Sequence, residues 1–447
     1  MSGIALVAYK HGIHVTGSDL KESRYMRALL SEGIEVKVGH EPANVSDPTI
    51  EVVVVSTAIP ANNPELIEAQ RIGIPIWPRA KMLAHLAKGK RTLAVSGTHG
   101  KTTTSSMLAS SLDRLGAEPT FLIGGVVDGY DSTACAGNGE FFVVEADESD
   151  GSFLFLDPEI EIITNIEADH LDHYADLDEI ERTFADFMAK LVPDGIAVVC
   201  AHSPGLVELA KSSGRDYYSY GLSGNANVRC LVHDDKSFAV IFKDGQSVQL
   251  QLPVSPGTHN MLNATAVMAT LDLLGYDRVR SAEALGMFSG VRRRFDRIGE
   301  AAGVTVVDDY GHHPTEIKAT LQAARTLDFK RVHILFQPHR YSRTQAFIGD
   351  FGTAFDLADT VTFMDIYSAG EAPIPGVNGN LLVDAVLKHD PKADVRLVER
   401  RASVPQVMAE LALAGDLIIT MGAGDVTVMG PLILEQLAQV GEDHECL

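Results

Sequence analysis

The stretch AVSGTHGKTTT, Ala94–Thr104, is the strongest indication of the fold in the sequence. A strand-like apolar run, Thr92–Ser96, is followed by glycines at Gly97 and Gly100 and then by a threonine run that opens a helical segment. The order of strand, glycine turn and helix lets backbone N–H groups and a helix N-terminus surround a phosphate. The spacing departs from a strict G-x-x-x-x-G-K pattern, because Val95 stands where its first glycine would be. We nevertheless predict a phosphate-binding loop here.

The side chains of this loop suit a nucleotide triphosphate. The Lys101 ammonium can reach the β- and γ-phosphates, and the Thr102 hydroxyl can hold Mg²⁺. A plain glycine-rich turn with a solvated lysine is the alternative, and the threonines at the helix start argue against it. The predicted nucleotide contacts of the loop are Gly97, Thr98, His99, Gly100, Lys101, Thr102 and Thr103.

Similar strand-like runs recur along the chain, each followed by a polar turn and a helix-like stretch such as Thr103–Leu115 or Pro314–Leu327. The runs are continuously apolar, which indicates strands buried on both faces of a parallel sheet. We therefore predict an α/β protein with doubly wound sheets. The clearest predicted strands are Glu51–Val55, Thr92–Ser96, Phe141–Val144, Ile160–Asn165, Ile196–Cys200, Val304–Val307, Val332–Phe336, Val361–Met364 and Leu417–Thr420.

Composition excludes several classes of protein. The chain has 37 Lys+Arg against 60 Asp+Glu, a net charge of −23, which argues against nucleic acid or an anionic membrane as the main partner. Its four cysteines are scattered without a C-x-x-C pair, which excludes a disulfide framework and a cysteine zinc site. No apolar run reaches about 18 residues and no secretory signal opens the chain, so we expect a cytoplasmic protein.

Turn-rich, charged seams near Ala87–Arg91 and Ser289–Gly303 divide the 447 residues into three predicted domains. Residues 1–88 would form a Rossmann-like domain, to which the family resemblance given below assigns UDP binding. Residues 89–291 would form a central P-loop-type ATP-binding domain with a mostly parallel sheet, and 292–447 a C-terminal Rossmann-like domain. We expect the first of these to be either unusual or incomplete. Gly12–Asp19 indicates a helix end followed by a strand at His14–Gly17, so the chain begins inside the helix that normally follows a first strand and glycine turn.

Two acidic stretches follow predicted strands. In VVEADESD, residues 143–150, Glu145 is the expected Mg²⁺ ligand, because carboxylate and phosphate oxygens suit that ion. An acidic helix N-terminus is the alternative. In ITNIEADHLDHY, residues 163–174, Asp169 and His170 form a second candidate site. A zinc site built on His170 and His173 is possible, but the carboxylates favour Mg²⁺.

The second half of the chain carries further polar motifs. Asn side chains in HNMLN, residues 259–263, could pair with a purine edge or simply cap a helix. The cluster RRRFD, residues 292–296, could supply a hinge arginine that clamps a transferring phosphoryl group, or could be solvated. VDDYGHHPTE, residues 307–316, and FQPHRYSRT, residues 336–344, follow strands and offer His and Arg side chains to an anionic substrate. Solvated polar loops are the alternative for both.

These motifs together resemble the Mur ligase family over essentially the whole chain. GTHGKTT, residues 97–103, is similar to the family's ATP loop. The resemblance implies that Thr102, Glu145 and His170 bind metal, with His170 at a second Mg²⁺ near an acyl phosphate. It also implies catalytic roles for Lys101, His170, Arg294 and His313, although His312 and His313 are interchangeable on sequence alone. The implied nucleotide contacts outside the loop are His259, Asn260, Asn263, Arg294, Asp309 and Tyr310.

DDYGHHPTE and FQPHRYSRT are the most specific stretches and resemble the branch of the family that adds alanine. The resemblance implies ATP-driven amide formation through an acyl phosphate, with ATP and Mg²⁺ as cofactors and UDP-N-acetylmuramate and L-alanine as substrates. A recycling ligase that attaches a tripeptide to the same nucleotide is the nearest alternative. An inactive nucleotide-binding protein is the other.

The resemblance departs from the family at the start. MSGIA, residues 1–5, matches only the tail of the family's first glycine turn, so we expect the first strand and most of that turn to be missing and the UDP substrate to bind weakly. The candidates for substrate binding are Ser2, Gly3, Asp19, Ser56, Thr57, His339, Arg340 and Arg343.

Overall fold

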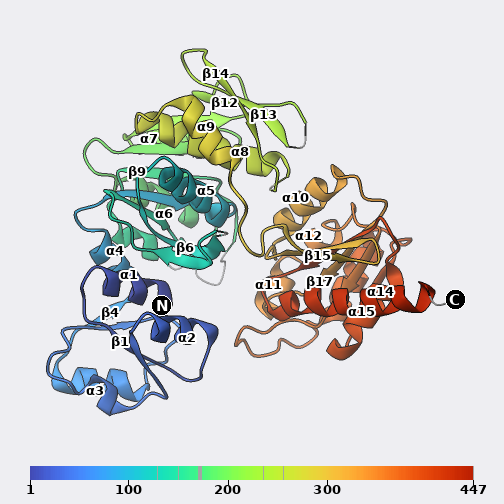
Figure 1. Ribbon diagram of the computed structural model, residues 1–447, viewed down its shortest axis with the longest axis horizontal. Coiled ribbons are helices and arrows are strands. Elements are labelled where there is room, and N and C mark those ends of the chain that lie inside the picture. The colour runs from blue at the N-terminus through green and yellow to red at the C-terminus, as the bar shows by residue number, and fades with distance from the viewer. Residues whose placement is uncertain (128, 150, 170–173, 235, 255, 446–447) are drawn as a thin grey trace. The chain divides into compact units, whose positions relative to one another are not determined.

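The structure is a computed structural model that describes residues 1–127, 129–149, 151–169, 174–234, 236–254 and 256–445. It confirms the predicted α/β class. The chain divides into two compact units, one of Met1–Leu231, Val240–Leu250 and Leu262–Phe288, the other of Val232–Ala239, Gln251–Met261 and Ser289–Leu447 (Figure 1). Within the described ranges, no helix combines the length and the apolar character needed to cross a membrane.

A ten-stranded sheet carries the predicted phosphate loop, with the strand order β14-β13-β12-β11-β10-β9-β5-β8-β6-β7. The neighbouring strands β11-β10-β9-β5-β8-β6 all pair in parallel, and β7 runs antiparallel to β6. The mostly parallel sheet agrees with the continuous apolar runs of the sequence. The strands are β5 (Arg91–Ser96), β6 (Thr120–Val127), β7 (Ser132–Cys135), β8 (Phe141–Glu145), β9 (Ile160–Ile163), β10 (Ile196–Cys200), β11 (Asp216–Gly221), β12 (Val228–Val232), β13 (Ser237–Ile241) and β14 (Ser247–Gln251).

Helix α5 (Lys101–Arg114) follows the loop and is buried on all sides from Thr102 to Leu112. It packs against β5, β6, β8 and α9, so small residues are needed around its circumference. Ser and Thr supply them in spite of their modest helix propensity, and Ser105 donates its hydroxyl back to the Lys101 carbonyl at 2.8 Å. The other elements of this region are η2 (Ser152–Phe155), α6 (Leu177–Met188), α7 (Leu206–Ser212), α8 (Thr258–Leu273) and α9 (Arg278–Gly286).

The first part of the chain forms two small parallel sheets, β1 with β2 and β3 with β4. The predicted early strand lies two residues later than expected, at Thr16–Asp19 rather than His14–Gly17, because the chain turns at Gly12 (φ +84°) before it extends. Helix α1 packs against β6, β7, α2 and α4. The elements are α1 (Ser2–Lys10), β1 (Thr16–Asp19), α2 (Arg24–Ser31), β2 (Glu35–Val38), η1 (Pro42–Val45), β3 (Val53–Val55), α3 (Pro64–Ile72), β4 (Ile76–Pro78) and α4 (Arg79–Ala87).

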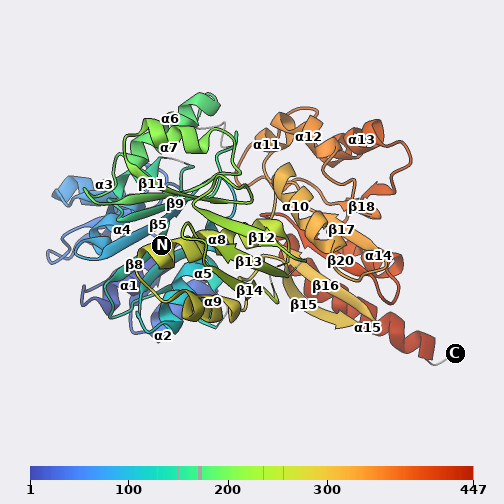
Figure 2. The same cartoon turned by 90° about the horizontal axis from the view of Figure 1, so that it is seen from above.

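The second unit is built on a six-stranded sheet, β15-β16-β20-β17-β18-β19, parallel except for β15. The consecutive residues Ile334 and Leu335 of β17 belong to two different hydrophobic clusters, so this strand is buried on both faces. Helices lie on both sides of the sheet (Figure 2). The strands are β15 (Asp296–Ala301), β16 (Val304–Asp309), β17 (Val332–Phe336), β18 (Thr360–Phe363), β19 (Val395–Leu397) and β20 (Leu417–Met421). The helices are α10 (Pro314–Arg325), α11 (Tyr341–Ala346), α12 (Ile348–Gly352), α13 (Gly379–His389), η3 (Arg401–Ser403), α14 (Val404–Leu411), η4 (Asp425–Val428) and α15 (Met429–Glu445).

Candidate active site

The loop between β5 and α5 requires glycine at two positions. Gly97 has φ +122°, and a Cβ there would lie 2.2 Å from Thr164 Oγ1 and 2.9 Å from the Asn165 carbonyl oxygen. Gly100 has φ +85° and precedes α5, and a Cβ there would lie 2.9 Å from Asn263 Oδ1. The glycines therefore allow the loop to approach two neighbouring segments closely and to take a left-handed turn into the helix.

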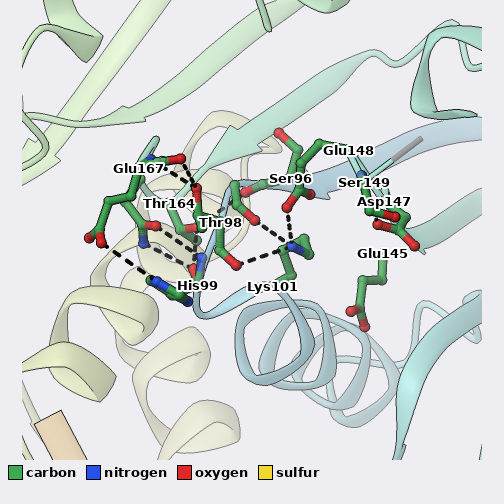
Figure 3. A network of polar contacts seen from close by, with 12 residues as sticks. Ser96, Thr98, His99, Lys101, Glu145, Asp147, Glu148, Ser149, Thr164 and Glu167 are labelled. Carbon is green, nitrogen blue, oxygen red and sulfur yellow. Dashed lines mark hydrogen bonds and ion pairs between the residues drawn. The ribbon is translucent and has the colours of Figure 1, made fainter. Parts of the chain in front are cut away.

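The segment after β9 holds this loop in place (Figure 3). The N–H groups of Thr98 and His99 donate to the Asn165 carbonyl and to Asn165 Oδ1 at 3.0 and 2.9 Å. Asn165 Nδ2 donates to the His99 carbonyl at 3.0 Å, and Thr164 Oγ1 donates to the same oxygen at 2.5 Å. Two loop amides are occupied in this way, whereas the amides of the first turn of α5 have no acceptor inside the helix, so these first-turn amides could bind a phosphate.

Lys101, the first residue of α5, points back into the loop. Its ammonium donates to the Gly97 carbonyl at 2.6 Å, to the Thr98 carbonyl at 3.2 Å and to Glu148 Oε1 at 2.7 Å (Figure 3). Burial lowers the pKa of Lys101, but Glu148, with smaller contributions from Asp147 and Glu145, outweighs burial, so the pKa of Lys101 is raised. Burial raises the pKa of Glu148 to about 7, although Lys101 opposes that shift.

The two predicted metal ligands described by the structure lie side by side. Thr102 Oγ1 donates to Glu145 Oε1 at 2.9 Å, and the Gly124 N–H donates to Glu145 Oε2 at 2.6 Å. Glu145 ends β8, and Val95 of β5 pairs with it across the sheet, so the carboxylate lies at the same edge as the phosphate loop. A hydroxyl and a carboxylate are hard oxygen donors, and they fit Mg²⁺. The predicted third ligand, His170, lies outside the described residues.

The residues predicted to contact adenine begin helix α8. Asn263 lies beside Gly100, as the close approach at that glycine shows. His259 and Asn260 precede it on the same helix, and Asn260 Nδ2 donates to the Pro256 carbonyl at 3.1 Å. Burial, with a smaller effect of Arg294, lowers the pKa of His259 to about 4, so its ring is neutral near pH 7.

The substrate candidates of the first part of the chain lie at element ends. Ser2 and Gly3 begin α1, and a Cβ on Gly3 would lie 3.0 Å from the Ala134 Cβ, so this glycine allows α1 to pack closely on β7. Asp19 ends β1, and its charge acts on the N-terminal ammonium of Met1. Ser56 and Thr57 directly follow β3, and Ser56 accepts a backbone hydrogen bond from Ile59 at 3.1 Å.

In the second unit, the segment that contains Arg294 is hydrogen-bonded to the end of β16. Asp309 accepts hydrogen bonds from the N–H groups of Phe295 at 2.8 Å and Gly311 at 2.7 Å. The Arg294 guanidinium lies 3.6 Å from Glu316 and 5.2 Å from the centre of the Tyr310 ring. The structure therefore brings Arg294, Asp309 and Tyr310 together, as predicted for residues that contact one nucleotide.

The structure distinguishes the two adjacent histidines that the sequence left interchangeable. His313 is buried and caps α10: its Nδ1 accepts from the Thr315 N–H at 3.3 Å, and Glu316 completes the capping box. Its ring packs against Phe347 at 4.6 Å. His312 is more exposed and lies 5.7 Å from the His339 ring. His312 is thus the histidine whose ring lies next to the arginine-bearing loop.

That loop follows β17 and carries the last substrate candidates. The His339 ring stacks on Tyr367 at 5.8 Å, and Arg343 lies 3.2 Å from His339 Nδ1. Arg340 has φ +69° and lies 4.0 Å from Glu371, which also accepts from the Ser342 hydroxyl at 2.6 Å. Burial, helped by the two arginines, lowers the pKa of His339 to about 4. The loop therefore offers two cations around a neutral imidazole, which suits an anionic group.

Sequence reasoning missed several partners of these residues. Glu148 stood in the acidic run without a role, and Glu316 could have been found from its capping-box spacing after His313. Gly124 and Glu371 gave no local signal, because their partners are 21 and 29 or more residues away in the chain. Those contacts depend on how distant strands are paired.

Similarity to known proteins extends over nearly the whole chain. Residues 1–91 match the model "Mur ligase family, catalytic domain", 95–271 match "Mur ligase middle domain" and 293–424 match "Mur ligase, glutamate ligase domain". The chain is 46% identical over 439 residues to the UDP-N-acetylmuramate–L-alanine ligase of Rubrobacter xylanophilus, covering 98% of this chain and 97% of that one. The solved UDP-N-acetylmuramate-alanine ligase of Thermotoga maritima is 30% identical with a TM-score of 0.82, covering 98% and 97%. A murein peptide ligase of Psychrobacter arcticus has the same fold, with a TM-score of 0.72, 24% identity, and coverage of 98% and 96%.

Proposed function

Because the chain belongs to the Mur ligase family, we propose that it joins L-alanine to the lactoyl carboxylate of UDP-N-acetylmuramate and converts ATP to ADP and phosphate. The relatives at 46% identity carry that activity in their names, and the match extends over 98% of this chain. The product would be a precursor of peptidoglycan, and the reaction would take place in the cytoplasm.

The reaction has two steps in which charges must be neutralised. The lactoyl carboxylate attacks the γ-phosphorus of ATP, ADP leaves and an acyl phosphate forms. The amine of L-alanine then attacks the acyl carbon, phosphate leaves and the amine loses a proton. The first step brings an anion to an anion, so cations and N–H donors around the phosphates are essential.

The chain's own residues suit these steps. Lys101 and the first-turn amides of α5 would bind the β- and γ-phosphates, and Arg294 would approach the transferring group. Asn263 lies beside the loop, where it could contact the nucleotide. Thr102 and Glu145 would hold Mg²⁺, which supplies positive charge to the phosphate oxygens. His339, Arg340 and Arg343 are the proposed contacts for the anionic groups of substrate or product.

The observation that carries this proposal is the meeting of a phosphate loop and an oxygen-donor pair at one sheet edge. Lys101 donates a hydrogen bond to the Gly97 carbonyl of the loop, and the next residue, Thr102, donates a hydrogen bond to Glu145 at 2.9 Å. The carboxyl edge of a parallel sheet is where α/β proteins bind nucleotides. Glu145 lies next to Lys101 and Thr102 because β5 and β8 are neighbours in the sheet.

The test is phosphate release by the purified protein with ATP, Mg²⁺ and UDP-N-acetylmuramate. We expect release that depends on L-alanine, with glycine and L-serine as competing amino acids. A tripeptide in place of L-alanine separates the recycling ligase from the alanine-adding enzyme. Release that requires the tripeptide, or no release with any amine, would contradict the proposal.

A further inference from the structure

Lys101 has every one of its ammonium protons engaged within the protein. Its three N–H donors meet the carbonyls of Gly97 and Thr98 and the carboxylate of Glu148. A lysine ammonium has no fourth donor. A phosphate oxygen can therefore bind Lys101 closely only if one of these three acceptors withdraws.

The three acceptors differ in how readily they can withdraw. The two carbonyls belong to the loop itself, and the hydrogen bonds to Thr164 and Asn165 fix that loop. Glu148 contributes a side chain, whose carboxylate can turn about its own bonds. Exchange of one anion for another, carboxylate for phosphate, also keeps the charge of Lys101 neutralised.

The main chain of Glu148 is fixed even though its side chain can turn. The Glu148 carbonyl accepts from the Gly151 N–H at 3.0 Å and from the Tyr174 hydroxyl. The Lys101 and Glu148 side chains are only 14% and 3% exposed, so each ion needs a partner close by. Glu148 is thus placed to meet Lys101 again whenever the phosphate leaves.

We propose that Glu148 is a positioning residue that holds the Lys101 ammonium in the empty phosphate loop, gives way to a phosphate of the nucleotide, and takes Lys101 back as ADP leaves. The inference rests on the proposed function, since it assumes that the loop binds ATP. It assigns to Glu148 a competing role: the carboxylate opposes nucleotide binding and assists release.

The sign of the effect distinguishes this role from a structural one. Glu148→Gln keeps the shape and a hydrogen-bond acceptor but removes the competing charge. We expect ADP to bind roughly tenfold more tightly by isothermal titration calorimetry, at the lower end of what close charge pairs give in double-mutant cycles. We also expect kcat for phosphate release to fall, because ADP leaves more slowly. A variant that merely damaged the loop would bind ADP more weakly.

Two controls test whether Glu148 acts through Lys101. Asp147→Asn removes a neighbouring charge that acts on Lys101 through space without a hydrogen bond, while Asp147 forms an ion pair with Arg79 at 3.8 Å. We expect it to change ADP affinity less than twofold. In the Lys101→Met background, Glu148→Gln should no longer tighten ADP binding. Glu148→Asp, which keeps the charge but draws it back, serves as a second variant and should show a smaller tightening.

Several results would overturn the inference. These are unchanged or weaker ADP binding in Glu148→Gln, the same tightening in Asp147→Asn, or the same tightening in the Lys101→Met background. Failure of the unaltered protein to bind ADP at all would instead contradict the proposed function. The two failures are therefore distinguishable in one set of titrations.

Discussion

Gly124→Ala should weaken metal binding without unfolding the protein. A Cβ at this position would lie 2.9 Å from each carboxylate oxygen of Glu145, closer than carbon and oxygen pack in ordinary contact. The carboxylate is the end of a flexible side chain, so it would turn away, and the backbone of β6 would stay in place. Glu145 would then lose the 2.6 Å hydrogen bond from Gly124 and its alignment with Thr102.

The loss of a partner that orients a metal ligand costs roughly 10–100-fold in metal affinity, or about 1.4–2.7 kcal/mol. The assay is a titration of Mn²⁺, used in place of Mg²⁺, into the protein with ADP, followed by electron paramagnetic resonance. Gly224→Ala is the matched control, because no atom lies within 4 Å of a Cβ built there and its backbone is not left-handed. Mn²⁺ affinity within twofold of the unaltered protein in Gly124→Ala, or an equal loss in Gly224→Ala, would refute the reasoning.

Three further predictions follow from the ion pairs and the buried carboxylate of the site. Lys101→Ala should lower the rate of ligation by on the order of 10³-fold. It should also lower the melting temperature, because Glu148 is left buried without its cation. Adding Glu148→Gln should restore most of the melting temperature but not the activity. Arg294→Ala should lower kcat by on the order of 10²-fold while ADP affinity changes little, and equal losses in both would mark a ground-state contact. Burial raises the pKa of Asp309 from 3.8 to about 6, so protonated Asp309 contributes its full free energy to folding below pH 3.8. About 3 kcal/mol of the free energy of unfolding is lost as the pH rises through 6. Urea unfolding of Asp309→Asn between pH 4 and 7 should not show that loss.

Local sequence was sufficient for several strands and for the glycine loop after β5. β5, β8, β10 and β17 appear within a residue of their predicted bounds, because buried parallel strands must be apolar on both faces and that pattern is visible without the fold. Gly97 and Gly100 were also recognisable, since a left-handed turn before a helix demands them. The division into three domains stays a prediction, as do the individual roles of the site residues.

The rest depended on which strands become neighbours. Gly124 reaches Glu145 because β6 pairs with β8, and no local pattern encodes that pairing. The histidine pair shows the same limit in another form. The sequence places His312 and His313 side by side, but only the start of α10 shows that His313 Nδ1 caps that helix.

Ion pairs within the protein also explain why the sequence motifs indicated the cations but not their partners. Lys101 and Arg294 are cations in partly buried positions, and each has a carboxylate nearby, Glu148 at 2.7 Å and Glu316 at 3.6 Å. Leaving such a cation unpaired would be costly, so a site built to bind phosphate needs an internal anion until the phosphate arrives. Affinity for the nucleotide is then the difference between two sets of ion pairs, not the sum of the new contacts. Substitution of the internal acids therefore reports on binding as directly as substitution of the cations, and with the opposite sign.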